Sequence, residues 1–223
     1  MSNKKTVNIT CPRCNYIQDV DLYESINANK DFELKEALMR NKINRINCDN
    51  CDFNFRVDLP FLYFDSKNQI CIHWVPEIKD ISHEQILEEF DQVINQLDTR
   101  DTEVLRIRLV RTRVELVELI FLIEKKMNDR LIEFIKYEIF INNPKKLNPL
   151  KNRLLLNIEN STDEELLFVI QDMQTNELGE ILRYNRSTYT SLSDLYLEDS
   201  EEFKQMFPGP CINARYLLLE ESN

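Results

Sequence analysis

Four cysteines near the start of the chain have the spacing of metal ligands. Cys11 and Cys14 form one Cys-x-x-Cys pair, and Cys48 and Cys51 form a second. Each pair can close a tight turn that supplies two thiolates. Four thiolates form the tetrahedral ligand set of Zn²⁺, with each sulfur about 2.3 Å from the metal. We therefore expect one structural zinc ion held by these four residues, with no open position for a catalytic water.

The main alternative is a dithiol redox centre, because Cys-Pro-x-Cys sequences also occur in glutaredoxin-like proteins. In those proteins the first cysteine begins a helix, which lowers its pKa. The residues after Cys14 instead alternate between apolar and polar types, as in a strand, and the second pair completes a metal site. His73 and His83 lie outside the cysteine spacing, so we expect them in a hairpin and in the first turn of a helix. Cys71 and Cys211 are expected to be buried free thiols.

Short strands and one helix are expected to position the two cysteine pairs. The residues from Val7 to Thr10 alternate and lead into the first pair. An apolar stripe after Asn27 and Asn29 predicts a helix capped by one of these asparagines. Further strands are expected at 16–23, 53–59, 61–64 and 70–75. This order predicts a zinc ribbon with a helix inserted between its two cysteine turns.

The residue after each cysteine pair supports the same type of turn at both sites. Turns of this kind usually have a glycine directly after the second cysteine, where the backbone is often left-handed. Asn15 and Asp52 occupy these two positions. Asparagine and aspartate are among the few other residues that tolerate this conformation, so both turns are expected to form despite the missing glycines.

Further sequence features accompany the two cysteine pairs and share their order with a known domain. They are the Cys11-Pro12-Arg13-Cys14 opening, the entry to the helix at Ser25-Ile26-Asn27, the helical Leu34-Lys35-Glu36-Ala37-Leu38-Met39, and Leu62-Tyr63-Phe64-Asp65 after the second pair. In this combination about the first 75 residues resemble the CpXC domain, named for its Cys-Pro-x-Cys opening. The usual glycine after each pair is absent, and Asp49 replaces the usual proline after Cys48. The resemblance implies a zinc-binding domain of bacteria and archaea without an assigned activity.

The remainder of the chain is expected to form an α+β domain. Its predicted elements are a strand at 104–111, helices at 112–126 and 130–141, strands at 154–158, 166–170 and 180–184, helices at 190–196 and 200–207, and a segment at 212–219 that is either helix or strand. We expect three parts: a CpXC-like zinc-ribbon domain at 1–80, a linking helix at 81–99, and a carboxyl-terminal α+β domain at 100–223 with a small antiparallel sheet.

Composition narrows the classes of function and location. The formal net charge is −11, from 39 acidic and 28 basic residues, which disfavours a general nucleic-acid coat. Only two glycines occur, so glycine-rich loops that cradle phosphates are absent. No apolar segment approaches the roughly 18 residues of a membrane span, and no signal peptide is expected. Cysteines held as metal thiolates favour a cytoplasmic location.

Two strips of basic residues interrupt the acidic composition. One runs along the inserted helix from Lys35 to Arg45, and the other, from Arg106 to Arg113, lies in the densest run of arginines. The favoured interpretation of the second strip is that it pairs with Glu103, Glu115 and Glu118. The alternative is contact with an anion or a nucleic acid. Acidic clusters at 163–165 and 198–202 are expected to be solvated turns and helix starts.

These observations favour a zinc-stabilised, non-enzymatic binding or regulatory protein. A protein partner is the first hypothesis, because aromatic residues gather just after the ribbon, although packing in a core would explain them equally well. These residues are Phe61, Tyr63, Phe64 and Trp74. Binding of nucleic acid through the two basic strips is the alternative. An enzyme with its site in the carboxyl-terminal domain is third, because two histidines offer few acid–base arrangements.

Overall fold

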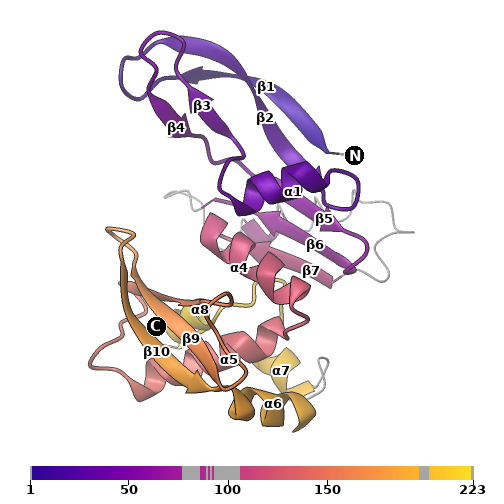
Figure 1. The fold of residues 1–223 in the computed structure, drawn as a ribbon, viewed down its shortest axis with the longest axis vertical. Helices are drawn as coiled ribbons and strands as arrows, with labels where there is room; N and C mark the ends of the chain where they lie inside the picture. The colour runs from indigo at the N-terminus through magenta and orange to yellow at the C-terminus, as the bar shows by residue number, and fades with distance from the viewer. Residues whose placement is uncertain are drawn as a thin grey trace. The chain divides into compact units, whose positions relative to one another are not determined.

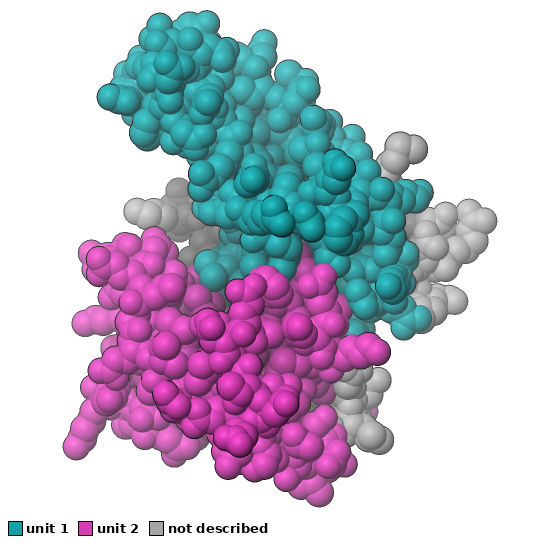
Figure 2. Space-filling view, viewed as in Figure 1, with its two compact units in different colours: residues 1–117 teal, residues 118–223 magenta. Residues whose placement is uncertain are grey.

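The computed structural model describes residues 2–76, 86–88, 90, 92, 106–195 and 201–221. The chain divides into two compact units, residues 1–117 and 118–223 (Figure 2). The fold is α+β, with a mixed five-stranded sheet and smaller antiparallel sheets, so the predicted class is confirmed. Within the described residues, no helix is both long enough and apolar enough to cross a membrane. The linking helix predicted at 81–99 lies largely outside the described residues.

A mixed sheet forms the body of the first unit (Figure 1). Its strands, in spatial order, are β1 (Asn3–Thr10), β2 (Ile17–Asn27), β5 (Phe61–Asp65), β6 (Ile70–Trp74) and β7 (Arg106–Val110). The β1–β2 and β5–β6 pairs are antiparallel, whereas β5 runs parallel to β2 and β7 runs parallel to β6. Parallel neighbours need long crossover connections, so this sheet joins strands that are distant in the sequence.

The first crossover, from β2 to β5, carries the inserted helix and the second cysteine pair. Helix α1 spans Phe32–Met39, and β3 (Arg45–Asn47) pairs antiparallel with β4 (Asn54–Arg56). Figure 1 shows this small hairpin beside the end of the β1–β2 hairpin at which the chain turns from β1 into β2. The two cysteine turns are therefore brought to one end of the unit, as a zinc ribbon requires.

The helix begins later than the sequence suggests. Asp31, not Asn27 or Asn29, is its N-cap residue. The side-chain oxygen of Asn27 instead accepts hydrogen bonds from the N–H groups of Asn29 and Lys30, which closes a turn just before the helix. Asparagine side chains often bind nearby main-chain N–H groups outside helices in this way. This explains why the two asparagines led to a predicted helix start that is too early.

The aromatic residues after the ribbon belong to the core of the first unit. Phe61, Tyr63 and Trp74 are almost completely buried on the central strands β5 and β6. Leu38 of α1 is also fully buried. Of the two explanations that the sequence left open for these aromatic residues, core packing holds for these three, and Phe64 is half-buried.

The second unit combines an antiparallel sheet with several helices. The sheet has the order β10 (Leu178–Asn185), β9 (Glu165–Asp172), β8 (Asn152–Leu156). The described helices are α4 (Arg113–Glu124), which spans the boundary between the units, α5 (Asp129–Asn142), α6 (Arg186–Leu195), α7 (Glu201–Met206) and α8 (Ala214–Glu220). The segment predicted at 212–219 is thus a helix. The core includes Leu131, Ile135 and Phe168.

A buried charge network ties together four elements of the second unit. The ammonium group of Lys136 donates to Glu118 Oε2 at 2.8 Å and to Glu133 Oε1 at 2.7 Å. The remaining carboxylate oxygens accept from the main chain: Glu118 Oε1 from Leu156 N–H at 2.6 Å, and Glu133 Oε2 from Ala214 N–H at 2.8 Å. Every carboxylate oxygen in the network therefore has a donor, as buried charges require.

Candidate metal centre

The fold brings the four predicted cysteines into one cluster. Their sulfur atoms all lie within 4.8 Å of one another. The Sγ atoms of Cys11 and Cys51 are 3.8 Å apart, and those of Cys14 and Cys48 are 3.5 Å apart. Close contacts thus run between the two pairs, and all four sulfurs belong to one cluster.

The two cysteine turns have the same main-chain hydrogen bonds. In each, the N–H of the first cysteine donates to the carbonyl five residues later, at 2.8 Å for Cys11 and 3.0 Å for Cys48. The carbonyl of the same cysteine accepts from the residue four positions later, at 3.0 Å from Asn15 and 2.9 Å from Asp52. These two residues have φ angles of 58° and 53°, the left-handed conformation that the sequence predicted.

Polar hydrogens point at the sulfur atoms. The N–H of Arg13 donates to Cys11 Sγ at 3.4 Å, and the side-chain amide of Asn50, from the other turn, donates to Cys14 Sγ at 3.7 Å. The N–H of Tyr16 and then the amide of Asn50 lower the pKa of Cys14 to about 6. Such donors stabilise a thiolate, which is the form of cysteine that binds metals.

Crowding has the opposite effect on another thiol of the cluster. The N–H of Phe53 lowers the pKa of Cys51, but burial and the three neighbouring thiols together raise it to about 12. One thiol of the group therefore ionises easily and another resists ionisation. Four thiolates this close together need a cation among them to be stable.

The dimensions of the cluster fit zinc. In a tetrahedron with metal–sulfur bonds of about 2.3 Å, neighbouring sulfurs are about 3.8 Å apart. Two of the distances between the pairs, 3.8 Å for Cys11–Cys51 and 3.5 Å for Cys14–Cys48, lie close to this value. The four cysteines are therefore placed closely enough to hold a metal ion, and a four-thiolate set leaves no coordination position for a substrate or water.

Gln18 is a component of the site that the sequence analysis missed. Its side chain is 8% exposed. Its Nε2 donates to the carbonyl of Asn47 at 3.1 Å, and its Oε1 accepts from the N–H of Asp49 at 3.0 Å. These two groups flank Cys48, so Gln18 of β2 holds the second cysteine turn against the β1–β2 hairpin. In the sequence, Gln18 is only one polar residue of an alternating strand.

Comparison with known families agrees with this site. The family model described as "CpXC protein" matches residues 9–136, more than half of the chain. The chain belongs to the CpXC protein family. The match extends well beyond the first 75 residues, through β7, α4 and part of α5. No curated protein and no solved structure matches the chain.

The remaining cysteines and histidines of this CpXC protein lie away from the cluster or outside the described residues. His73, on β6, is 5% exposed and stacks on Phe90 with ring centroids 6.1 Å apart. Burial lowers its pKa to about 4. Cys71 is buried, as predicted, and burial raises its pKa to about 11. Cys211 is only half-buried, contrary to expectation, and His83 lies outside the described residues.

The second basic strip of this CpXC protein is largely buried. Arg108, Arg111 and Arg113 are each less than a tenth exposed. The guanidinium of Arg111 donates to the carbonyl of Val75 at 3.1 Å, and that of Arg113 to the carbonyl of Leu38 at 3.2 Å. Main-chain carbonyls thus replace some of the acidic partners that the sequence suggested.

The three acidic residues that were expected to pair with this strip do not share one role. Glu115 accepts from the main-chain N–H groups of Arg111 and Thr112, at 3.0 Å each, and closes the start of α4. Glu118 binds Lys136 instead of an arginine, so this expected pairing was wrong. Glu103 lies outside the described residues.

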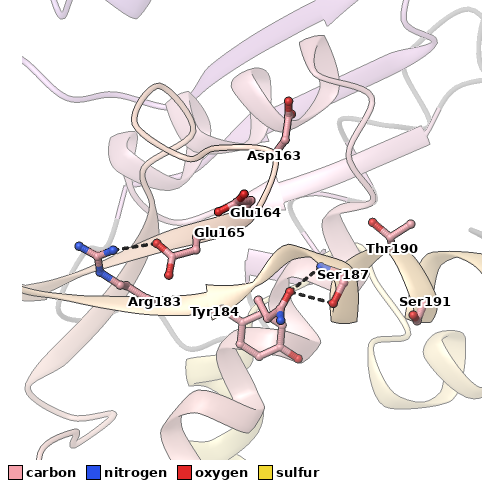
Figure 3. A pocket seen from close by; sticks show the side chains of 9 residues that line it. Asp163, Glu164, Glu165, Arg183, Tyr184, Ser187, Thr190 and Ser191 are labelled. Atoms are coloured by element: carbon pink, nitrogen blue, oxygen red, sulfur yellow. Dashed lines mark hydrogen bonds and ion pairs between the residues drawn. The ribbon is translucent and has the colours of Figure 1, made fainter.

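A surface pocket of about 910 Å³ lies in the second unit (Figure 3). It is lined by Asp163, Glu164, Glu165, Arg183, Tyr184, Asn185, Ser187, Thr190 and Ser191. Arg183 pairs with Glu165 at 2.8 Å, and Asn185 accepts from the N–H and hydroxyl of Ser187. The polar groups drawn in Figure 3 thus partly satisfy one another. No histidine or cysteine is among these described lining residues.

Proposed function

We propose that the first unit is a zinc-stabilised binding module without catalytic activity, in which Cys11, Cys14, Cys48 and Cys51 hold one structural Zn²⁺. The observation that most supports this proposal is the cluster of four sulfur atoms, which two turns with the same main-chain hydrogen bonds hold together. Bound there, the metal would supply cross-linking of two chain segments, and no reacting group would reach it. A reducing, cytoplasmic location suits a site made of thiolates.

The surface beside the cluster supports a protein as the partner. Tyr16 and Ile17, directly after the first turn, are 44% and 56% exposed. Across the cluster, Phe53 stacks on Phe55 with ring centroids 6.1 Å apart, and the Arg13 guanidinium lies 5.8 Å from the Phe53 ring. Aromatic, aliphatic and arginine side chains at one end of a rigid module are typical of protein interfaces. This end replaces the buried aromatic residues as the candidate contact surface.

The presence of bound zinc is tested by mass spectrometry of the purified protein under native and denaturing conditions. The native mass should exceed the denatured mass by one zinc ion. Replacing Cys48 with serine should remove that excess and lower the melting temperature, because metal binding is coupled to folding. Cys211→Ser, in the second unit, is the matched control and should retain the zinc. A wild-type chain that carries no metal under reducing conditions would contradict the proposal.

The partner is tested separately by affinity purification from the native cell, with and without nuclease. A protein partner should remain bound after nuclease treatment and be lost with the double variant Tyr16→Ser, Ile17→Ser. Leu178→Ser, which alters a 65% exposed leucine of β10, is the control for removal of apolar surface. Retention of the partner by the double variant would contradict this contact surface, whereas loss after nuclease would favour nucleic acid.

A further inference from the structure

The two basic strips meet in the first unit, although they are far apart in the sequence. Arg45 of β3 and Arg56 of β4 stand directly opposite each other in the register of the small hairpin. Arg113, at the start of α4, interacts electrostatically with both. Three arginines from three elements therefore form one group, named here the arginine triad.

Hydrogen bonds at the end of α1 connect two members of the triad. The carbonyl of Leu38 accepts from Arg113 Nη2 at 3.2 Å and from the N–H of Asn41 at 3.0 Å. The side-chain oxygen of Asn41 accepts from Arg56 Nη1 at 2.9 Å. Arg56 also forms a two-pronged pair with Asp58, at 2.8 and 3.2 Å.

The described residues provide less negative than positive charge around Arg113. Among them, Asp58 is the one carboxylate that interacts electrostatically with Arg113, whereas two arginines, Arg56 and Arg45, oppose its charge. Arg113 is 8% exposed, and its Nε has no hydrogen-bond partner among the described residues. Burial, followed by the charges of Arg56 and Arg45, lowers its pKa to about 10.

Closure of the helix end explains only part of this arrangement. The Arg113 side chain and the main-chain N–H of Asn41 both satisfy the carbonyl of Leu38 near the end of α1, and cationic side chains often bind helix ends in this way. Arg45, however, is exposed, and its side chain makes no hydrogen bond or ion pair with any described residue. Like charges directly opposite each other across two strands destabilise the pairing, and a buried guanidinium without a full counter-charge is costly.

A bound oxyanion would remove both penalties. We propose that the outer face of the β3–β4 hairpin binds an anion of the phosphate class, contacted by Arg45 and Arg56 and stabilised from behind by the buried charge of Arg113. Asn47 and Asn54, two register positions along and therefore on the same face, are exposed and hydrogen-bonded to each other at 2.7 Å, and so extend this face with amide groups. Arginine forks match the geometry of phosphate oxygens.

The chain contains its own reporter for this site. Trp74 is the only tryptophan, and the Arg113 guanidinium lies 5.8 Å from its ring centroid. Inorganic phosphate is titrated into the zinc-loaded full-length protein while tryptophan fluorescence is recorded, with potassium chloride at matched ionic strength as the blank. A saturable change is expected for phosphate. No saturable change beyond the chloride blank overturns the proposal.

Substitutions locate the binding. Arg45→Gln and Arg56→Gln should each weaken phosphate binding by about tenfold or more, the loss expected for one charge-assisted contact. Arg40→Gln is the matched control, because this exposed arginine near the same helix end pairs with Glu36 at 3.6 Å. Its affinity for phosphate should stay unchanged. Equal weakening in all three variants would indicate unspecific attraction and overturn the site. Circular dichroism and zinc content verify that each variant is folded.

A short single-stranded oligonucleotide distinguishes the source of the phosphate group. If the oligonucleotide competes with phosphate and is weakened by the same two substitutions, the site accepts a nucleic-acid backbone. If only free phosphate binds, the ligand is a small phosphorylated molecule. Either result supports an anion site at the arginine triad, whereas binding of the oligonucleotide that ignores both substitutions contradicts it.

Discussion

Replacing Gln18 with leucine should loosen the second cysteine turn without altering a cysteine. The substitution leaves the carbonyl of Asn47 and the N–H of Asp49 without their buried partner. Each such group costs about 1–3 kcal/mol, and the buried leucine side chain returns roughly 1–2 kcal/mol. We therefore expect the first unit to lose about 2–3 kcal/mol of its free energy of unfolding.

Zinc affinity should fall with stability, because Gln18 orients the turn that carries Cys48 and Cys51. Loss of an outer-shell partner typically lowers metal affinity by about 10–100-fold. The assay is competition for zinc with a chromophoric chelator, together with thermal unfolding followed by circular dichroism. Gln174→Leu is the control, since Gln174 is exposed in the second unit. It should change neither quantity.

The variant Gln18→Glu keeps only one of the two hydrogen bonds. A carboxylate still accepts from the N–H of Asp49, but its buried negative charge would face the carbonyl oxygen of Asn47, so a loss at least as large as in Gln18→Leu is expected. Wild-type zinc affinity and melting temperature in Gln18→Leu would refute the argument. A wild-type protein that binds no zinc would instead contradict the metal centre itself and leave the predicted loss of stability as the remaining test.

Three further predictions concern buried groups. Lys136→Met leaves two buried carboxylates without their cation and should cost about 3–5 kcal/mol in denaturant unfolding, and an unchanged midpoint would contradict this. Because the folded protein lowers the pKa of His73 to about 4, the unfolded chain binds a proton first. Stability should then fall by up to about 3 kcal/mol as the pH decreases from about 6.5 to 4, and less steeply in His73→Leu. Finally, a thiol reagent should label half-buried Cys211 rapidly in the zinc-loaded protein and label Cys71, 1% exposed, only after unfolding. Rapid labelling of both would contradict the described burial.

The parts of the structure that depend on residues close together in the sequence could be predicted from it. The cysteine turns follow from a spacing of three residues and from Asn15 and Asp52, which adopt the expected left-handed backbone. Alternation predicted the strands of both units close to where they lie. The segment at 212–219 was ambiguous because its apolar residues are consecutive, and the N-cap Asn213 decides for a helix by accepting from the N–H groups of Arg215 and Tyr216.

The parts that depend on contacts between residues far apart in the sequence could not be predicted. β7 joins the sheet beside β6 through a crossover, and alternation in a single strand carries no information about its neighbour. Gln18 resembles any polar residue of a strand until the fold places Cys48 beside it. The same holds for the arginine triad. Arg113 meets Arg45 and Arg56 only because α4 begins near the end of α1, which the sequence does not indicate.

The buried charge network has a consequence for the order in which the second unit forms during synthesis. Ala214 N–H satisfies one oxygen of Glu133, although the two residues are 81 positions apart. Until the ribosome has added this late segment, Glu133 Oε2 lacks the N–H donor that Ala214 provides in the folded protein. Water must therefore remain around this carboxylate. The helices and sheet can assemble earlier, but the core cannot become dry before nearly the whole chain has emerged. The cysteine turns of the first unit carry no such delay, because they are complete within the first quarter of the chain.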